Sequence, residues 1–388
     1  MRYLAVMDTF GAGGAERSNA DTWLYLQSKG VDIQLVALQH REYGTEQELV
    51  KSGLNIIFLK QGNVFGHAKQ LVKIIKEFQP DIVHSTLFKS NIRLRWAKVF
   101  GGKFYHLESL VNTTYNSSRI IDPGVTWFNL SAYWLLDTIS INFLADHFHA
   151  VAHTVAHHYN RRLGVSLNKI TVVPRGRNKN DDVGDPGNRA YYRKEFGLTP
   201  GQIMILTAGR QEYQKGHPRA INALGYAKNE LGLDNFKYVL LGRQGTATSE
   251  IQKGIIDNGL EDHVVLPGHR YDVSKIMAAA DMFLFSSLYE GIGGALIEAQ
   301  AAGLPAICSD IPELRETGTP DSTVFVDSTQ AAEFGNEIFK LASDEPLRKR
   351  MGEASIHSFS TRFEMAKIQQ DMYEFFVSLS KKHSQNVY

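Results

Sequence analysis

Short apolar runs alternate with amphipathic segments along almost the whole chain. Apolar runs bounded by turn residues are typical of buried strands, and apolar residues three or four positions apart are typical of helices. In the first half, the runs predict strands at Tyr3–Met7, Asp32–Leu38, Asn55–Leu59, Asp81–Ser85, Lys103–Glu108, Phe148–Ala152 and Lys169–Val173. Segments such as Ala15–Lys29 and His67–Phe78 predict helices between them. This rhythm indicates βαβ units and a parallel sheet.

A polar stretch from Pro174 to Arg189 interrupts the rhythm and is expected to be a linker or hinge. A second series of strands is then predicted at Met204–Ala208, Tyr238–Leu241, Val264–Pro267, Met282–Phe285, Ala306–Ser309 and Thr323–Val326. Helical patterns continue from Ala331 to about Lys381. Two such series in 388 residues predict two α/β domains. Because ligands bind at the carboxyl ends of parallel strands, the residues that follow each strand are the candidates for function.

Charge and cysteine content exclude several classes of protein. Lys plus Arg total 42 and Asp plus Glu total 41, so no bulk positive charge favours nucleic acid as a partner. Cys308 is the single cysteine, which excludes an intrachain disulfide and a cysteine-based zinc site. His153 and His157 have helical spacing but lack the glutamate of a zinc protease between them, so we expect no metal.

Neither an export signal nor a membrane span is expected. The apolar run at the N-terminus ends at Asp8, which is too short for the core of a signal peptide. The aromatic stretch from Trp127 to Ala145 is interrupted by Asn129, Asp137 and Asn142, whereas a span needs about twenty nearly continuous apolar residues. We therefore expect a cytoplasmic protein.

A glycine loop follows the first predicted strand and contains Gly11, Gly13 and Gly14. Glycines at this place let the backbone approach a ligand and leave the amides of a helix N-terminus directed at an anion. The loop departs from the dinucleotide fingerprint because Glu16 occupies the place of its third glycine. The second strand also ends in Gln39 and His40 where that fingerprint has an acid. We therefore do not expect a nicotinamide or flavin cofactor, and a tight turn that binds nothing remains the alternative.

Two cations and two acids follow strands of the second series. Arg210 and Lys215 come after Met204–Ala208, where a planar guanidinium and a compact ammonium suit a diphosphate. Glu290 follows Met282–Phe285, and Glu298 lies in the expected helix Ala295–Ala302. Between the two acids the backbone is nearly bare, at Gly291, Ile292, Gly293 and Gly294. Such a loop suits an anion, and carboxylates suit vicinal hydroxyl groups of a ribose or a sugar.

The segment from Glu290 to Glu298 resembles the E-x7-E motif of the family 4 retaining glycosyltransferases, which have the GT-B fold. The similarity extends over nearly the whole chain, in the family's order, to Gly13–Glu16, Val172–Gly176, Gly209–Gly216 and Ala301–Asp310.

The resemblance implies two Rossmann-like domains whose parallel sheets face each other across a cleft. Residues 1–176, with a C-terminal helix over about residues 364–388 that crosses back, would form the N-terminal, acceptor-side domain. Residues 177–363 would bind the donor.

The resemblance also implies roles for individual residues. Arg210 and Lys215 would bind the donor diphosphate and stabilise its departure, and Glu290 would hold the transferred sugar. Glu298 would hold the ribose, and the amides of Gly291–Gly294 would lie beside the sugar.

Further residues are implied around the donor and on the acceptor side. Gly13 and Gly14 would close over the phosphates from the N-terminal domain, and His269 and Arg270 would lie near the base. Glu16, His106 and Asn112 are the acceptor-side candidates. Many relatives place a histidine near the transferred sugar, and either His106 or Asn112 takes its place here. The Val-Pro-x-Gly turn has Arg175 where relatives commonly have Asn.

The activity implied is the transfer of a hexosyl group from a nucleotide-sugar, which we expect to be UDP-glucose or a similar UDP-hexose. Retention of configuration without a metal is implied, and the acceptor would be a sugar or a lipid-linked oligosaccharide in surface polysaccharide synthesis. Two alternatives remain open: a non-catalytic sugar-nucleotide sensor, and an epimerase or phosphorylase on a similar fold.

Aromatic side chains are dense between Tyr115 and Phe148. The favoured interpretation is a helix packed in the core. The alternative is a platform for the acceptor or a lipid-facing surface, because aromatic rings stack on sugars and suit membrane interfaces. This alternative leaves open a peripheral association with the inner membrane surface.

Overall fold

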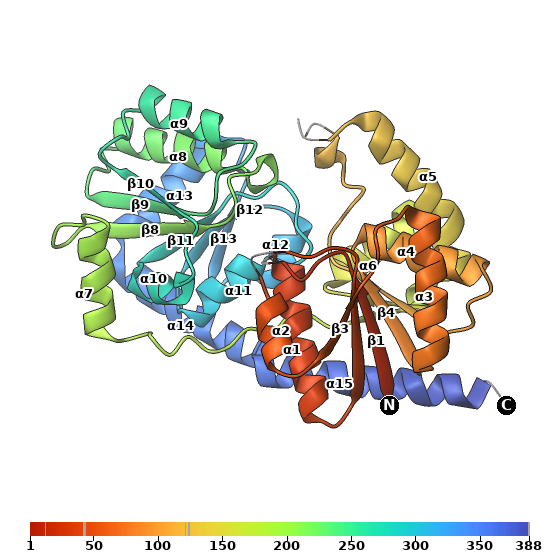
Figure 1. The fold of residues 1–388 in the computed structure, drawn as a ribbon. Coiled ribbons are helices and arrows are strands. Elements are labelled where there is room, and N and C mark those ends of the chain that lie inside the picture. Colours follow the sequence, from red (N-terminus) through yellow and green to blue (C-terminus); the bar gives the residue numbers. More distant parts are fainter. Residues whose placement is uncertain (12, 42–43, 121, 123–124, 387–388) are drawn as a thin grey trace. The chain divides into compact units, whose positions relative to one another are not determined.

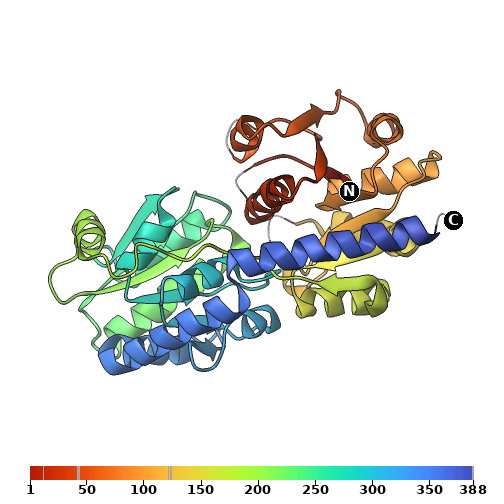
Figure 2. The same ribbon diagram turned by 90° about the horizontal axis from the view of Figure 1, so that it is seen from below.

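The computed structural model describes residues 1–11, 13–41, 44–120, 122 and 125–386, and Figures 1 and 2 draw it as a ribbon. Contacts divide the chain into two units. Unit 1 consists of Met1–Tyr115, Phe128–Gly176 and Ala366–Tyr388, and unit 2 of Asn116–Trp127 and Arg177–Met365. The segment Asn116–Trp127, which no sequence pattern separates from its neighbours, therefore groups with unit 2.

Unit 1 contains a parallel sheet of seven strands in the order β3-β2-β1-β4-β5-β6-β7. Its strands are β1 (Arg2–Met7), β2 (Asp32–Ala37), β3 (Asn55–Phe58), β4 (Ile82–Thr86), β5 (His106–Leu110), β6 (His147–Ala150) and β7 (Ile170–Val172). The helices along this part of the chain are α1 (Gly14–Ser28), α2 (Glu46–Lys51), α3 (Val64–Phe78), α4 (Phe88–Val99), α5 (Trp127–Leu144) and α6 (His153–Leu163). Buried residues of α1 and α2 cover one face of the sheet, and those of α3 and α4 cover the other.

The C-terminal helix α15 (Met365–Asn386) belongs with unit 1 (Figures 1 and 2). Its residues Ile368, Met372, Phe375 and Leu379 recur at helical spacing and are buried in the same cluster as Tyr3 of β1. Burial of this stripe explains why the end of the chain returns to the first sheet. The predicted return of the C-terminal helix is confirmed.

Unit 2 contains a parallel sheet of six strands in the order β10-β9-β8-β11-β12-β13. The strands are β8 (Ile203–Ala208), β9 (Phe236–Leu241), β10 (Val264–Gly268), β11 (Met282–Phe285), β12 (Ala306–Ser309) and β13 (Thr323–Val326). The helices are α7 (Pro186–Glu195), α8 (His217–Asn229), α9 (Thr248–Asp257), α10 (Val273–Ala279), α11 (Gly294–Ala301), α12 (Pro312–Thr317), α13 (Ala331–Ser343) and α14 (Glu345–Arg362). Helices α8, α9 and α13 cover one face, and α7, α10 and α11 cover the other (Figure 1). The predicted class, two parallel α/β units, is confirmed.

Two local predictions need correction. The fifth strand was expected at Lys103–Glu108 but spans His106–Leu110, so it begins three residues later and ends two residues later. Arg95 pairs with the carboxylate of Glu108, which allows this acid to be buried inside the strand. The linker was expected to extend to Arg189, but α7 already begins at Pro186. Asp185 caps this helix by accepting hydrogen bonds from the amides of Gly187 and Asn188, and a proline at the first helical position favours the start.

The aromatic helix α5 is not packed in the core as the sequence favoured. Only Asp137 and Ile141 are buried in it, while Phe128, Ile139 and Phe143 are 75%, 62% and 83% exposed. The physical reason is Asp137, whose buried carboxylate pairs with Arg95. This pair holds the side of the helix that carries Asp137 against the rest of unit 1, so the exposed apolar residues lie on the other side. Within the described residues, no helix combines the length and apolar character that crossing a bilayer requires.

Buried histidines connect neighbouring strands of unit 1. His84 of β4 contacts Tyr3 and the Ser109 hydroxyl, and Ser109 in turn contacts His149, whose Nε2 lies 2.8 Å from the carbonyl of Val173. Burial lowers the pKa of His106 to about 3 and that of His149 to about 4. These rings are therefore neutral in the folded protein at pH 7.

We expect the free energy of unfolding to fall as the pH is lowered from about 6.5 to about 4, the interval between the unfolded and folded pKa of His149. In that interval the histidine is protonated in the unfolded chain but stays neutral in the folded protein. Each such group therefore lowers stability by up to about 1.4 kcal/mol per pH unit. Urea unfolding followed by tryptophan fluorescence measures this. His149→Gln should reduce the slope, whereas His357→Gln, on the exposed surface of α14, should leave it unchanged. Equal slopes in both variants would contradict the assignment.

Candidate functional site

The predicted cations and acids of unit 2 gather at the carboxyl ends of two neighbouring strands. Arg210 and Lys215 lie on the connection between β8 and α8, and Glu290 lies on the connection between β11 and α11. Strands β8 and β11 are adjacent, with β9 on the other side of β8, so this is the point where the strand order reverses. A crevice at such a point is the usual ligand site of a parallel sheet.

Hydrogen bonds hold the two connections together. The amide of Leu288 donates to the carbonyl of Gln214 at 2.8 Å, and the Gln214 side chain donates to the carbonyl of Tyr289 at 2.8 Å. The Ser286 hydroxyl donates to the carbonyl of Lys215 at 3.1 Å. These bonds fix the position of Lys215 relative to Glu290.

Lys215 and Glu290 form a close ion pair. The Lys215 Nζ donates to Glu290 Oε1 at 2.5 Å, and the two side chains are only 17% and 9% exposed. The ammonium also lies 5.4 Å from the centre of the Phe285 ring. An ion pair with so little water around it is strongly oriented, because little solvent screens the two charges.

Gly216 makes this approach possible. Its φ is +61°, and a Cβ built on it would lie 2.1 Å from the carbonyl oxygen of Ser286. Any other residue would therefore push apart the two connections that carry Lys215 and Glu290.

Glu298 pairs with Arg177, a residue that the sequence analysis did not select. The Arg177 Nε donates to Glu298 Oε1 at 2.6 Å. The same guanidinium lies over the start of α11, because a Cβ on Gly294 would be 2.9 Å from Arg177 Nη2. The signal was present in the sequence, since Arg177 directly follows the Val-Pro-Arg-Gly turn.

The glycine loop between the two acids is partly occupied by its own hydrogen bonds. The amide of Gly294 donates to the carbonyl of Ile292 at 2.6 Å, and that of Gly293 donates to the hydroxyl of Thr317 at 3.3 Å. Gly291, Ile292 and Gly293 are buried. Two of the amides expected to bind the donor thus already have acceptors within unit 2.

Arg210 extends into solvent, with a side chain that is 53% exposed and 3.7 Å from Glu212. The loop that carries it is anchored by His217, whose Nε2 lies 3.0 Å from the carbonyl of Arg210. Burial lowers the pKa of His217 to about 4, so the ring is neutral and adds no charge to the site at pH 7.

His269 and Arg270 follow β10 and line an open hollow of about 510 Å³. His269 is exposed. Arg270 pairs with Glu195 at 2.5 Å and with Asp272 at 2.7 Å, and the bond from Arg270 holds the pKa of the Asp272 carboxyl well below its usual range. The guanidinium of Arg270 therefore already forms ion pairs with two acids of unit 2.

In unit 1, the glycine loop also lies at the carboxyl edge of its sheet. Gly13 caps α1, and Gly14 is its first residue. The Glu16 side chain folds back over the loop, since a Cβ on Gly13 would meet it. Arg175 lies at the same helix start, because a Cβ on Gly14 would be 3.2 Å from Arg175 Nη1. An arginine beside a helix N-terminus adds to its attraction for an anion.

Of the two candidates for the family's histidine position, only Asn112 lies at this edge. Asn112 follows β5 and is partly exposed. His106 is the first residue of β5 and is fully buried, with Nε2 2.9 Å from Ser85 Oγ and Nδ1 3.1 Å from the carbonyl of Leu144. A side chain at the amino end of the strand and without exposed surface is badly placed for an acceptor.

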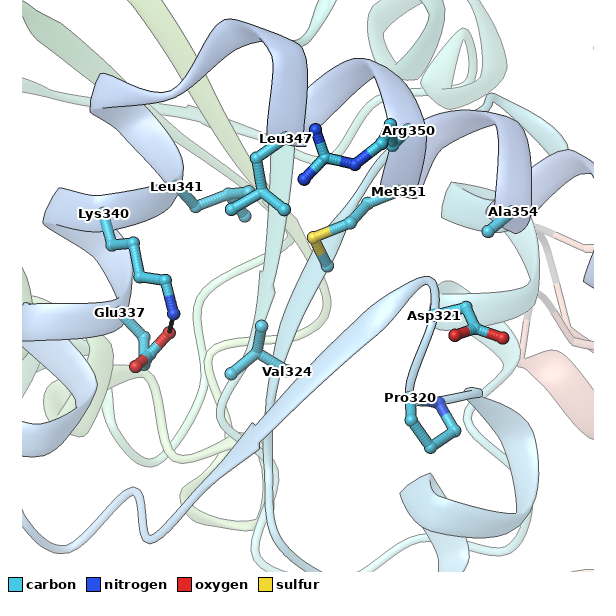
Figure 3. A pocket seen from close by; sticks show the side chains of 10 residues that line it. All are labelled: Pro320, Asp321, Val324, Glu337, Lys340, Leu341, Leu347, Arg350, Met351 and Ala354. Carbon is cyan, nitrogen blue, oxygen red and sulfur yellow. Dashed lines mark ion pairs between the residues drawn. The ribbon is translucent and has the colours of Figure 1, made fainter.

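A second hollow of about 400 Å³ lies between β13, α13 and α14 (Figure 3). Pro320 and Asp321, which line it, precede β13, so it lies at the opposite edge of the sheet from the site. Glu337 and Lys340 pair beside it at 3.5 Å. It contains none of the residues predicted to bind a donor. Among the residues that the structure describes, no group of three or more His, Cys, Asp and Glu side chains is arranged to hold a metal ion.

Solved structures share this fold over almost the entire chain. The structure of Anabaena HepE in complex with UDP and glucose covers 97% of this chain and 99% of its own, with a TM-score of 0.81 at 18% identity. The crystal structure of a glycosyltransferase from Rickettsia africae has the same TM-score, 0.81, at 20% identity, and covers 97% of this chain and 98% of its own. The fold is therefore that of the GT-B glycosyltransferases.

Family models identify the group within that class. A model described as "Glycosyl transferases group 1" matches residues 188–358, and one described as "Glycosyltransferase Family 4" matches residues 12–180. Together they cover most of the chain, which belongs to the family 4 glycosyltransferases of the group 1 type.

The chain spans about half the length of the first curated relatives it matches. One of these, the lipopolysaccharide glucosyltransferase WaaG of Escherichia coli K12, is 26% identical over 181 residues, which are 46% of this chain and 47% of its own. A longer match is a UDP-Gal:alpha-D-GlcNAc-diphosphoundecaprenol alpha-1,3-galactosyltransferase of Escherichia coli. It is 22% identical over 306 residues, which are 77% of this chain and 76% of its own.

We expect Gly216→Ala to destabilise the protein and to disturb the Lys215–Glu290 pair. The matched control is Gly197→Ala, which has a similar φ of +70° but nothing within 4 Å of the new Cβ. Both variants carry the cost of a left-handed backbone, about 1–3 kcal/mol, and only Gly216→Ala adds the clash with Ser286. Thermal unfolding of the two variants measures the difference. Equal losses of stability would show that the close approach at Gly216 is unimportant.

Proposed function

We propose that the protein is a retaining hexosyltransferase that uses a nucleotide-sugar, with UDP-glucose or a similar UDP-hexose as the donor. The acceptor is a sugar or a lipid-linked oligosaccharide, and the product serves surface polysaccharide synthesis. The observation that carries the proposal is the buried Lys215–Glu290 pair at the carboxyl ends of β8 and β11. Membership of the family supports the reaction class. A relative named for transfer from UDP-Gal and a similar structure bound to UDP and glucose support a nucleotide-sugar donor.

Lys215 is suited to the diphosphate end of the donor. Its ammonium is almost buried, so a charge that develops on the departing nucleoside diphosphate meets a cation with little screening. Arg210, on the same connection but exposed, adds a second cation that is free to reorient. In this proposal the two cations offset the leaving-group charge without a metal ion.

Glu290 is suited to the sugar. The bond from Lys215 occupies Oε1 of its carboxylate, and a carboxylate retains further lone pairs that accept bonds from sugar hydroxyls. In the transfer, the bond between the anomeric carbon and the diphosphate oxygen breaks. The acceptor oxygen then forms the new bond on the same face, and the departing diphosphate takes its proton.

Glu298 is suited to the ribose, and Arg177 is then its competitor. When ribose hydroxyls donate hydrogen bonds to the Glu298 carboxylate, they either replace the bond from Arg177 Nε or share the carboxylate with it. The Arg177 guanidinium lies at the start of α11, close to where the resemblance expects the phosphates. Arg177 thus joins the proposed donor residues.

The two acids are expected to respond differently to loss of charge. Glu298→Gln should weaken UDP binding about 10- to 100-fold, because a hydrogen bond to a charged group is lost. Glu290→Gln should weaken UDP binding less than Glu298→Gln does, since Lys215 and Arg210 remain, and should lower turnover about 100-fold. Calorimetry with UDP and release of UDP from the UDP-sugar measure the two effects. Glu353→Gln, on the exposed surface of α14, is the control. Unimpaired turnover in Glu290→Gln would refute its role.

The donor and the reaction are tested with a panel of UDP-, GDP- and ADP-sugars. We expect a UDP-hexose to raise the unfolding temperature and to release UDP slowly, with release insensitive to EDTA and accelerated by an acceptor. NMR of the product should show the anomeric configuration of the donor. A donor that binds without release would favour a sensor. An acceptor-independent isomeric product would favour an epimerase, and phosphate-dependent release would favour a phosphorylase.

A further inference from the structure

Helix α5 presents its apolar side chains outward and its charge inward. It has 18 residues, of which only Asp137 and Ile141 are buried. Asp137 is also its single charged residue. Helices on the surface of soluble proteins show the reverse arrangement, and an exposed apolar surface of this kind marks an interaction site.

A buried polar cluster holds α5 in this orientation. Arg95 of α4 is 2% exposed and donates from Nη1 to Asp137 at 2.6 Å and to the hydroxyl of Ser140 at 3.0 Å. Its other nitrogens donate to both carboxylate oxygens of Glu108 at 2.7 and 2.6 Å. The hydroxyl of Tyr115 donates to the second oxygen of Asp137. Because these bonds fix one side of the helix, the other side must face outward.

The outward side of α5 forms a continuous apolar stripe. Phe128, Leu135, Leu136, Ile139 and Phe143 are all exposed. Leu135 and Leu136 are neighbours, and the other steps of seven, three and four residues place the five on one broad face, opposite Asp137. At 1.5 Å per residue, the stripe is about 22 Å long. We call these five residues the α5 stripe.

Cations and aromatic rings with polar edges border the α5 stripe. The indole nitrogen of Trp134 donates to the carbonyl of Arg162 at 3.1 Å, at the end of α6, where Arg161 and Arg162 are exposed. At the other border, the Tyr133 ring lies 4.8 Å from the ring of Phe88, which precedes the exposed Lys89.

The two acids of the segment from Trp127 to Asp146 already have cationic partners. Asp137 pairs with Arg95 inside the unit, and Asp146, just beyond α5, pairs with Lys98 at 2.5 Å. The border of the stripe therefore has a positive character.

We propose that the α5 stripe docks on the surface of an anionic phospholipid bilayer. Apolar side chains enter the boundary of the acyl region, while Trp134 and Tyr133 lie at the level of the headgroups. Arg161, Arg162 and Lys89 then meet the negative headgroups. A second copy of the chain is a poorer occupant, because a symmetric contact brings the same cationic border against itself. The inference does not depend on the proposed reaction, since it concerns binding alone.

The test is sedimentation of the full-length protein with vesicles of phosphatidylcholine containing about one third phosphatidylglycerol, without any nucleotide-sugar. We expect the protein to bind these vesicles and to bind pure phosphatidylcholine more weakly. Ile139→Glu should abolish binding, because it places a charge on the stripe. Ile256→Glu on α9 is the matched control, since Ile256 is 65% exposed and Ile139 is 62% exposed. It should bind like the unchanged protein.

The cationic border is tested separately by the double variant Arg161→Gln with Arg162→Gln. Two cations near an anionic surface are together worth about a 30-fold change in affinity, so binding should weaken by that factor and become less sensitive to salt. Ile139→Ser is a second stripe variant that adds no charge and should weaken binding. Thermal unfolding of each variant shows whether it is folded.

Three results would overturn the proposal. The first is absence of binding by the unchanged protein to anionic vesicles. The second is unaltered binding by folded Ile139→Glu. The third is a concentration-dependent dimer that Ile139→Glu dissociates, which would assign the stripe to a second copy. None of these outcomes affects release of UDP from a donor, so failure of this proposal and failure of the proposed function are distinguishable.

Discussion

The uniform direction of the strands is the constraint on which the candidate site depends. Every pairing among the strands of unit 1 and of unit 2 is parallel, so all connections that leave the carboxyl ends of one sheet lie at the same edge. This is why Lys215 and Glu290, separated by 75 residues, form an ion pair. It is also why Gly14 and Arg175 of unit 1 meet at the start of α1. The strand order also reverses between β8 and β11, which is the usual place of a ligand site in a parallel sheet.

The site of unit 2 is organised by two ion pairs of unequal character. The pair of Lys215 and Glu290 is nearly buried and supported by backbone bonds between its two loops. The pair of Arg177 and Glu298 is more open, with Glu298 38% exposed. Screening by water makes the second pair easier to exchange for a ligand than the first. A ligand would therefore meet one preformed ion pair and one that is easier to exchange.

Buried charge governs unit 1 in another way. Arg95 satisfies the carboxylates of Glu108 and Asp137 together, and this one cluster accounts for two departures from the sequence predictions. It lets β5 continue through a glutamate, and it turns α5 so that its apolar residues lie outside. Removing one member of such a cluster would leave an unpaired buried charge, which is costly, so the orientation of α5 is well determined.

The order of strands and helices, the two sheets and the edge that carries the site could all be predicted from the sequence. Apolar periodicity is a local property, and the direction of βαβ units follows from chain geometry. Arg210, Lys215 and Glu290 were selected because they lie on connections that follow predicted strands, and Glu298 because it lies in the next expected helix. Their roles toward a donor stay predictions. Only the tertiary structure decided which cation pairs with which acid, that Arg177 joins Glu298, that His106 is buried at the wrong end of β5, and that α5 faces outward. Those outcomes depend on contacts between residues far apart in the chain, and no local pattern specifies where such a partner lies.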